Sequence, residues 1–296
     1  MSINRLDIQI RDPFVLPVPE EKLYYLFGTT DPDPWKGAGV GFDTYQSADL
    51  ETWEGPLCAF RPEKGFWATR NFWAPEVHRY GGFYYMFASF IAPERRRGTQ
   101  ILRSAHPGGP YLPHSDGPVT PKDWACLDGT LYVDEEGAPW IVFCHEWVQV
   151  HDGEICALRL APDLAQSIGE PRLLFKGSAA AWTKSLPRRD GSGIVDARVT
   201  DGPFAHKTAK GGLILLWSSL SPAGYALGAA VSESGSLFGP WVQEEKPLVD
   251  VDGGHGMVFQ SFDGRLYLTY HKPNNTPMER FHYVELLERG NSLKTS

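Results

Sequence analysis

Long apolar runs, a basic surface and a cysteine framework are all missing from this sequence. No stretch approaches the ~20 apolar residues of a membrane-spanning helix, and residues 1–10 alternate polar and apolar side chains without the apolar core of a secretory signal. We therefore expect a cytoplasmic protein that has no membrane partner. The formal net charge of −8 argues against nucleic acid as a partner, because binding its phosphates needs a concentrated basic surface.

Cysteine and clustered arginine are equally sparse. Cys58, Cys126, Cys144 and Cys156 have no C-x-x-C spacing, so we expect buried reduced thiols rather than a zinc site or a disulfide framework. The one basic run, residues 95–97, is interpreted as a solvated loop.

Aromatic residues, glycine and proline are abundant instead. The chain has 16 Phe, 12 Tyr and 10 Trp beside 31 Gly and 24 Pro. Aromatic side chains favour pleated surfaces, and glycine and proline favour turns. This composition predicts an all-β protein.

A short apolar strand follows a turn five times along the chain, with starts between 52 and 74 residues apart. The five segments are residues 22–27, 82–87, 138–143, 212–217 and 264–269. This period is slightly longer than that of common four-stranded propeller blades, and five such blades use up the chain. The repeat predicts a five-bladed β-propeller forming one domain over residues 1–296, with blades at approximately 8–60, 67–120, 121–190, 195–245 and 250–290.

A second, shorter strand precedes each apolar segment. Aligning these shorter strands places their first residues in register, and these are Asp12, Ala74, Asp128, Asp201 and His255. The innermost strands of a propeller line its central channel, so we expect three aspartates and a histidine to meet at the axis. Trp53 and Trp241 occupy similar places further along their blades, and we expect them to pack between blades.

Carboxyl groups gathered in a concave site do not all ionise alike, because burial and like charges raise some of their pKa values. Glycoside hydrolysis needs such a difference, since one carboxylic acid protonates the departing oxygen while a carboxylate attacks or activates water. The alternative is a hydrogen-bonded or metal-tied plug that closes the channel.

The residues around these positions resemble family 43 glycoside hydrolases over residues 8–285. The resemblance lies in five motifs in order, which begin with Arg11-Asp12-Pro13, Trp73-Ala74-Pro75-Glu76, Leu127-Asp128-Gly129, Asp201-Gly202-Pro203 and Gly253-Gly254-His255-Gly256. It implies an inverting enzyme on a five-bladed propeller, similar to β-xylosidases, α-L-arabinofuranosidases and arabinanases, that cleaves terminal xylose, arabinofuranose or related glycosides of a carbohydrate substrate.

The resemblance also implies roles for three carboxyl groups. Asp12 would be the general base, Asp128 the carboxylate that raises the acid's pKa and orients it, and Asp201 the general acid. The family usually has Glu before Gly-Pro, so the shorter Asp201 departs from its pattern. Glu146, which follows the third-blade strand, is the alternative proton donor or a substrate-binding residue.

His255 and Arg280 complete the residues implied by the resemblance. The family often places a histidine beside a central calcium or sodium ion, usually through water, so His255 is a candidate for that metal site or for a neutral channel histidine. Arg280 resembles an arginine directed at the sugar, and a surface ion pair is its alternative. No cofactor is required when carboxylates transfer the protons.

Aromatic side chains in the loops are candidate walls of a sugar pocket. They are Trp35, Phe66, Trp67, Trp73, Trp147 and Trp182, of which Trp73 and Trp147 adjoin the axial motifs. Residues 31–44 and 60–71 are long enough to close one end, which favours an exo-acting pocket.

Two other functions remain open. A lectin-like propeller would keep the pocket but lack the acid. Asp201, which stands where the family usually has Glu, is the feature that suggests it. In a retaining or phosphorolytic relative, one aspartate attacks the sugar directly or phosphate replaces water. Phosphorolysis would need a basic cluster, for which the candidates are Arg70, His78, Arg79 and His145.

Overall fold

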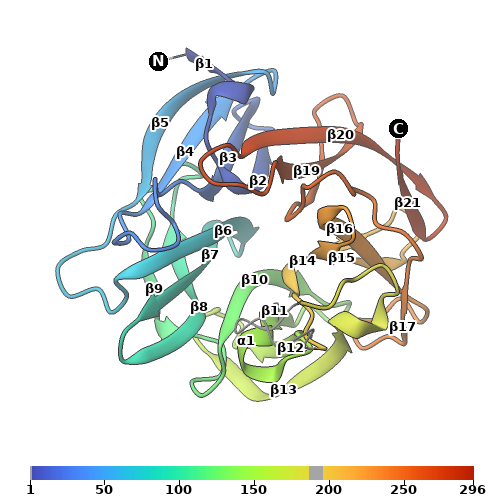
Figure 1. Ribbon diagram of the computed structural model, residues 1–296. Helices are drawn as coiled ribbons and strands as arrows, with labels where there is room; N and C mark the ends of the chain where they lie inside the picture. The colour runs from blue at the N-terminus through green and yellow to red at the C-terminus, as the bar shows by residue number, and fades with distance from the viewer. Residues whose placement is uncertain (1, 187–195) are drawn as a thin grey trace.

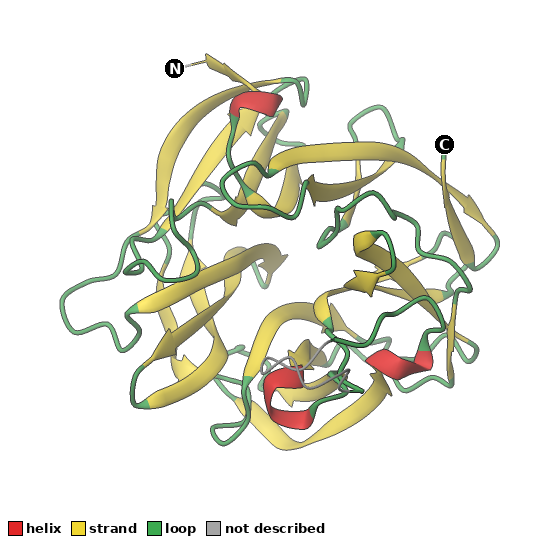
Figure 2. Ribbon diagram, viewed as in Figure 1, coloured by secondary structure: helices red, strands yellow, loops and turns green. Residues whose placement is uncertain are grey.

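Strands dominate the computed structural model, which describes residues 2–186 and 196–296. Figure 1 shows five antiparallel sheets arranged around a central axis as the blades of a propeller. Helix is confined, within these described residues, to α1 (Trp147–Val150) and the short 3-10 turns η1 (Arg5–Asp7) and η2 (Gly177–Ala179), as Figure 2 shows. The predicted all-β five-bladed propeller is confirmed.

In each blade the first-named strand below lies innermost. Blade 1 contains β2 (Arg11–Val18), β3 (Leu23–Thr29), β4 (Phe42–Ser47), β5 (Thr52–Phe60) and β1 (Ser2–Asn4). Blade 2 contains β6 (Arg70–Tyr80), β7 (Phe83–Ala92), β8 (Arg95–Ser104) and β9 (Leu112–Pro118). Blade 3 contains β10 (Cys126–Val133), β11 (Pro139–His145), β12 (Glu154–Leu160) and β13 (Ser167–Lys176). Blade 4 contains β14 (Asp201–Lys207), β15 (Leu213–Ser221), β16 (Gly224–Ser232) and β17 (Trp241–Gln243). Blade 5 contains β18 (Val258–Gln260), β19 (Leu266–Lys272), β20 (Arg280–Arg289) and β21 (Ser292–Thr295).

The repeated apolar segments are the second strands of the blades: β3, β7, β11, β15 and β19. Almost every residue of β15 is buried, because a strand in the middle of a blade is covered on both faces by the adjacent blades. A strand buried on both faces reads as a continuous apolar run, which is the signal that the repeat search detects. Strands β1 and β21 extend beyond the predicted blade bounds, and the predicted bounds at 190 and 195 lie outside the described residues.

Aromatic residues hold neighbouring blades together. Trp53 is fully buried and its ring packs against Phe281 of blade 5, with the ring centroids 5.7 Å apart. Trp241 packs against Phe175 of blade 3 at 6.0 Å. Both tryptophans therefore have the inter-blade packing role predicted for them.

Blades 1 and 5 close the ring. The backbones of Gln9 and Arg280 form a β-bridge, and Thr269 Oγ1 donates a hydrogen bond to Pro13 O at 2.8 Å. Figure 1 shows β2 and β19 side by side, so segments from the two ends of the chain complete the central channel.

The expectation of buried thiols is confirmed in part. Three of the four cysteines are buried, but Cys58 is exposed, which corrects the expectation for that residue. No helix of the described residues is long and apolar enough to cross a membrane.

Candidate active site

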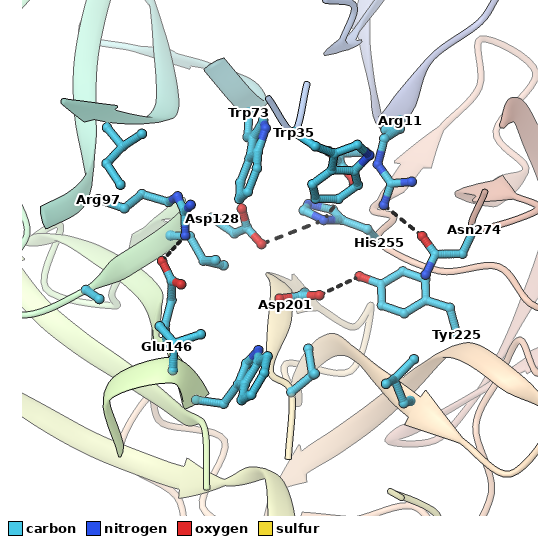
Figure 3. A pocket seen from close by; sticks show the side chains of 18 of the residues that line it. Arg11, Trp35, Trp73, Arg97, Asp128, Glu146, Asp201, Tyr225, His255 and Asn274 are labelled. Carbon is cyan, nitrogen blue, oxygen red and sulfur yellow. Dashed lines mark hydrogen bonds and ion pairs between the residues drawn. The ribbon is translucent and has the colours of Figure 1, made fainter. Parts of the chain in front are cut away.

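A cavity of about 880 Å³ opens at the axis, and all five blades contribute to its lining. Figure 3 shows its polar and aromatic side chains pointing toward one another from the ends of the inner strands and the adjoining loops. Eight of the twelve candidate catalytic, binding and wall residues line it: Asp12, Trp35, Trp73, Asp128, Glu146, Trp147, Asp201 and His255. The fold therefore brings together most of the residues that the sequence singled out.

A repeated backbone bulge directs side chains to the axis. The residue at this point has a positive φ in each blade: Asp12 (54°), Ala74 (46°), Asp128 (56°), Gly202 (50°) and His255 (49°). The strand register of the first four blades shifts around this residue. An extra residue at a bulge bends the strand and redirects the adjacent side chain.

Asp201 is one residue away from the position that the sequence alignment gave it. Gly202, not Asp201, has the positive φ in blade 4, and Asp201 pairs with Ser218 as Arg11 pairs with Thr29 in blade 1. The alignment of Asp201 with Asp12 is thus wrong by one residue. Asp201 still lines the cavity, because residues just before the bulge also face it, including Arg11 and Trp73.

Gly202 is required at the axial position of blade 4. A Cβ atom there would lie 2.6 Å from Cδ2 of His255, whose ring is buried. The Gly202 N–H donates a hydrogen bond to Asp128 Oδ2 at 3.0 Å. Gly202 thereby connects the Asp128 carboxyl of blade 3 to the blade 4 strand that carries Asp201.

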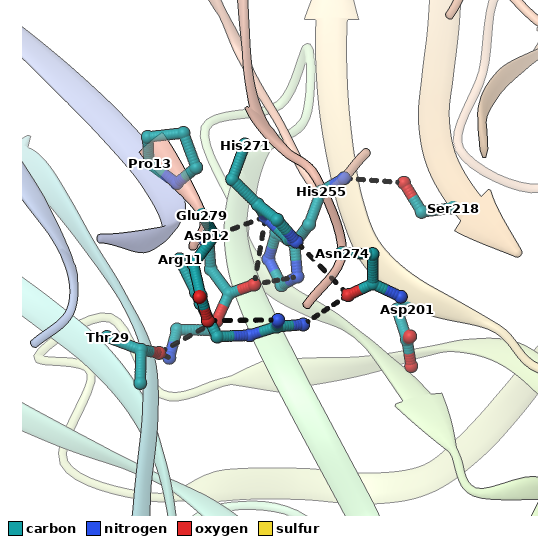
Figure 4. A network of polar contacts seen from close by, with 12 residues as sticks. Arg11, Asp12, Pro13, Thr29, Asp201, Ser218, His255, His271, Asn274 and Glu279 are labelled. Atoms are coloured by element: carbon teal, nitrogen blue, oxygen red, sulfur yellow. Dashed lines mark hydrogen bonds and ion pairs between the residues drawn. The ribbon is translucent and has the colours of Figure 1, made fainter. Parts of the chain in front are cut away.

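Asp12 is held by positive and neutral donors (Figure 4). Thr29 Oγ1 donates to its Oδ2 at 2.7 Å, and His255 Nδ1 lies 3.2 Å from its Oδ1. Burial alone would raise the pKa of Asp12, but the positive charges of His255 and Arg11 outweigh burial and lower it. Asp12 is therefore ionised and suited to accept a proton.

His271 supports Asp12 as a neutral side chain. Its Nδ1 accepts a hydrogen bond from the Asp12 N–H at 3.1 Å, so its proton is on Nε2, which faces Asn274 Oδ1 at 3.4 Å. Burial and the charge of Arg11 lower the pKa of His271 to about 3. The 3.6 Å approach of Nδ1 to Asp12 Oδ1 is therefore a contact between a neutral ring and a carboxylate, not an ion pair.

Asp128 and Asp201 are protonated more readily than Asp12. Burial raises the pKa of Asp128 to about 8, with the charges of Asp201 and Asp12 adding to the effect. Burial also raises the pKa of Asp201, to about 6, against the opposing charge of His255 and a hydrogen bond from Tyr225. Asp128 is buried, whereas Asp201 is half-buried and so more accessible to a ligand in the cavity.

His255 lies beside the axial carboxylates, at the position where the family resemblance implies a cation. Burial would lower the pKa of His255, but the carboxylates of Asp12 and Asp128 outweigh burial and raise it, so its Nδ1 is a protonated donor. Within residues 2–186 and 196–296, no cluster of His, Cys, Asp and Glu side chains could hold a metal ion. The expected calcium or sodium ion remains a prediction, and His255 acts here as a counter-ion to the carboxylates.

One wall of the cavity alternates guanidinium groups and indole rings. Arg11 lies over Trp35, the rings of Trp35 and Trp73 pack edge to face at 5.2 Å, and Arg97 lies over Trp73 at 4.1 Å. Arg97 also forms an ion pair with Glu146. Such stacked contacts hold aromatic faces in place for a sugar ring.

This wall corrects the interpretation of the basic run as a solvated loop. Residues 95–97 begin strand β8, and Arg96 and Arg97 line the cavity. Sequence reasoning also missed Arg11, Tyr225 and Asn274. Arg11 precedes the axial aspartate in the first motif, so its place in the sequence was a usable signal.

Several other expected residues lie elsewhere. The Arg280 side chain donates to the backbone oxygens of Leu6, Pro277 and Glu279, which corrects its expected place at the sugar. Phe66 packs in the apolar core, and Trp67 and Trp182 are likewise not among the described lining residues. The four candidates for a phosphate-binding cluster do not line the described cavity either: Arg70, His78, Arg79 and His145.

Comparison with known proteins places this geometry in context. The model of the family "Glycosyl hydrolases family 43" matches residues 6–289. An endo-arabinase from Bacteroides thetaiotaomicron is 42% identical with a TM-score of 0.89, and the match covers 98% of this chain and 98% of that one.

Two further solved structures are similar over nearly their whole length. A thermostable family-43 glycoside hydrolase is 26% identical with a TM-score of 0.80, and the match covers 100% of this chain and 93% of that chain. An endo-1,4-beta-xylanase from Bacteroides thetaiotaomicron is 25% identical with a TM-score of 0.76, and the match covers 98% of this chain and 94% of that chain. No curated protein matches this chain.

Proposed function

Because this chain belongs to glycosyl hydrolase family 43, we propose that it hydrolyses arabinofuranosyl linkages of arabinan. The chain is an inverting glycoside hydrolase, and the open question is its substrate. The observation that carries the choice of arabinan is the 42% identity with an endo-arabinase over 98% of both chains. The xylanase is only 25% identical, so xylan is the second candidate.

The surroundings of the three carboxyl groups support the roles that the family resemblance implies. Asp12 is the base: it takes a proton from a water molecule whose oxygen forms the new bond to the anomeric carbon. Asp201 is the acid: it gives its proton to the departing oxygen as the glycosidic bond breaks. Water enters on the face opposite the leaving group, so the configuration inverts. The lowered pKa of Asp12 and the raised pKa of Asp201 support this division.

Asp128 and Glu146 support the reaction without transferring the proton. Asp128 is buried beside Asp201 and holds the Gly202 N–H, which fixes the backbone next to the acid. Glu146 is ion-paired with Arg97 at the aromatic wall, and we assign it to binding sugar hydroxyl groups. Asp201 accepts a hydrogen bond from the neutral Tyr225 hydroxyl at 3.0 Å, and burial still raises its pKa to about 6, which suits a group that must hold a proton.

We propose that the enzyme cleaves internal linkages. Of the two segments expected to close the pocket, residues 31–44 contribute Trp35, whereas none of the described lining residues comes from 60–71. The likeness to an endo-arabinase supports binding of a chain rather than only its end.

Digestion of arabinan and xylan tests both proposals. We expect arabinan to release a mixture of short oligosaccharides early in the reaction, with xylan turned over much more slowly. Asp12→Asn is the control for contaminating activity and should lose at least about 100-fold in kcat. Release of single arabinose units alone would contradict internal cleavage, and a preference for xylan would contradict the assigned substrate.

A further inference from the structure

Hydrogen bonds between neighbouring blades form a ring around the axis. At four of the five blade boundaries, the N–H of the axial residue donates to a side chain on the second strand of the preceding blade. The bonds are Ala74 to Thr29 Oγ1 (2.8 Å), Asp128 to Ser89 Oγ (2.8 Å), His255 to Ser218 Oγ (2.8 Å) and Asp12 to His271 Nδ1 (3.1 Å). Figure 4 shows the last two of these.

The accepting side chains occupy one equivalent position in their blades. Each lies opposite the residue before the bulge, as in the pairs Arg11–Thr29, Trp73–Ser89, Asp201–Ser218 and Gly254–His271. The corresponding pair in blade 3 is Leu127–Cys144. Cys144 is therefore the residue that would complete the ring between blades 3 and 4.

Between blades 3 and 4, the N–H of the axial residue does not donate to a side chain on the second strand of the preceding blade. The Gly202 N–H donates to Asp128 Oδ2 at 3.0 Å. A thiol is a weak donor and a weak acceptor, so it does not compete with a carboxylate for this N–H. Burial raises the pKa of the Cys144 thiol, which keeps it neutral.

Blade 1 shows what a hydroxyl does at this position. Thr29 Oγ1 accepts the N–H of Ala74 and donates its own proton to Asp12 Oδ2, the axial carboxylate of its blade. The hydroxyl thus stands between the carboxylate and the next blade. Asp128, with a thiol in the same place, bonds to the next blade directly.

We propose that Cys144 is a positioning residue: its weak hydrogen bonding leaves the Gly202 N–H to Asp128 and so fixes the Asp128 carboxyl against the strand that carries Asp201. The inference rests on the proposed function in one respect, the roles of Asp128 and Asp201 in catalysis. The hydrogen-bond arrangement itself rests only on the comparison of the five blades.

Substitutions of Cys144 that differ only in hydrogen bonding test this role. Cys144→Ser adds a hydroxyl that can accept the Gly202 N–H, as Ser89 and Ser218 do at their boundaries, and donate to Asp128. Cys144→Ala adds none, so it controls for lost volume. Thr200 is adjacent to the thiol, and a hydrogen bond between the two side chains acts against the burial that raises the pKa of Cys144, so the Thr200 hydroxyl could capture the new hydroxyl as well. The double variant Cys144→Ser/Thr200→Val removes that partner, and Thr200→Val alone is its control.

We measure kcat and KM on arabinan oligosaccharides, the unfolding midpoint, and the crystal structure of each variant. Because misplacing a catalytic group by about 1 Å can cost on the order of 100-fold, we expect Cys144→Ser and the double variant to lose about 10- to 100-fold in kcat with little change in KM. Cys144→Ala and Thr200→Val should stay within about two-fold of the parent. The crystal structure of Cys144→Ser should show the Gly202 N–H turned to the new hydroxyl.

Equal losses in Cys144→Ser and Cys144→Ala, or full activity in both serine variants, would overturn the proposal, because the thiol would then only fill space. An unchanged Gly202–Asp128 bond in the Cys144→Ser structure would overturn it as well. A parent enzyme inactive on arabinan would contradict the proposed substrate instead, and the crystal structures would still decide the arrangement of the hydrogen bond.

Discussion

Asp12 and Asp128 occupy equivalent bulge positions in blades 1 and 3, yet their pKa values shift in opposite directions. Asp12 lies beside the charges of His255 and Arg11, which overcome the effect of burial. Asp128 is buried with weaker compensation and adjoins other carboxyl groups. Environment, not residue type, thus separates the carboxyl group whose pKa is lowered from those whose pKa is raised.

Removal of the Asp201 carboxyl tests the assignment of the acid. Asp201→Ala should lower kcat/KM by about 100-fold or more for arabinan oligosaccharides, whose departing oxygen needs a proton, and far less for activated aryl arabinofuranosides. Glu146→Gln is the comparison, and it should affect both substrates by a similar factor. Selectivity for the leaving group in Glu146→Gln, with none in Asp201→Ala, would transfer the acid's role to Glu146.

Tyr225 sets the pH range in which Asp201 can act. Its O–H donates to Asp201 Oδ2, which favours the ionised carboxylate, while burial raises the pKa of Asp201 to about 6. Tyr225→Phe should therefore raise the pKa of Asp201 further. An acid acts in its protonated form, so activity falls as pH rises through this pKa, and the alkaline limb of the kcat/KM profile should move to higher pH.

The control for Tyr225→Phe is Tyr283→Phe, whose hydroxyl bonds to Glu51 and not to a cavity residue. It should leave both limbs in place. The acidic limb reports Asp12, whose lowered pKa places it below the ordinary aspartate value of about 3.9. Movement of the acidic limb in Tyr225→Phe, with the alkaline limb unchanged, would show that Tyr225 does not act on the acid.

At the scale of the strand, the bulge on each innermost strand determines which side chain reaches the axis. Asp12, Asp128 and His255 all adopt the positive φ of this position without glycine. Gly202 differs because the His255 ring occupies the space of its Cβ. Packing, rather than backbone conformation alone, therefore explains glycine in blade 4.

Gly202→Ala should consequently destabilise more than a glycine substitution at the same φ in open space. Gly81 has a φ of 53° with no atom within 4 Å of an added Cβ, so Gly81→Ala is the matched control. We expect the free energy of unfolding to fall by about 1–3 kcal/mol more in Gly202→Ala, the usual effect of overpacking a buried site. Equal losses in denaturant titrations of the two variants would contradict the clash.

The strand repeat was the part of the fold that the sequence predicted well, because second strands buried on both faces read as apolar runs. The bulge register was not predicted in blade 4. Pro13, Pro75 and Pro203 follow the axial residue in three blades, and aligning the prolines would have identified Gly202.

The partners of the carboxyl groups were missed because Tyr225 and His271 lie within strands whose pattern reports burial only. The expectation for Arg280 failed because its backbone partners come from the closure of the ring, which has no sequence signal.

At the scale of the whole molecule, the contact between blades 1 and 5 holds both the ring and the site. Glu279 of blade 5 is fully buried, and its Oε1 accepts hydrogen bonds from Arg11 at 3.2 Å and from Thr276 at 2.6 Å. Arg11 in turn adjoins Asp12 and donates to Asn274. The closure of the propeller and the charge state of the base are therefore linked through one guanidinium group.

Glu279→Gln should destabilise the whole propeller. Removing one partner of a buried ion pair leaves an uncompensated charge, which typically costs about 3–5 kcal/mol in the free energy of unfolding. Asp263→Asn, which breaks an exposed ion pair with Arg265, should produce no measurable change. Urea titration of both variants is the measurement, and equal stability of the two would show that Glu279 does not hold the ring closed.

The anomer first released from arabinan oligosaccharides tests the central claim most directly, because one product reports both the substrate and the cooperation of Asp12 with Asp201. Proton NMR during the first minutes of hydrolysis distinguishes the two anomers before mutarotation mixes them. Inversion of an α-L-arabinofuranosyl linkage predicts the β anomer as the first product, and Asp12→Asn should release neither anomer at a comparable rate. The α anomer as the first product would contradict the account, since it would require an aspartate to attack the sugar directly instead of activating water.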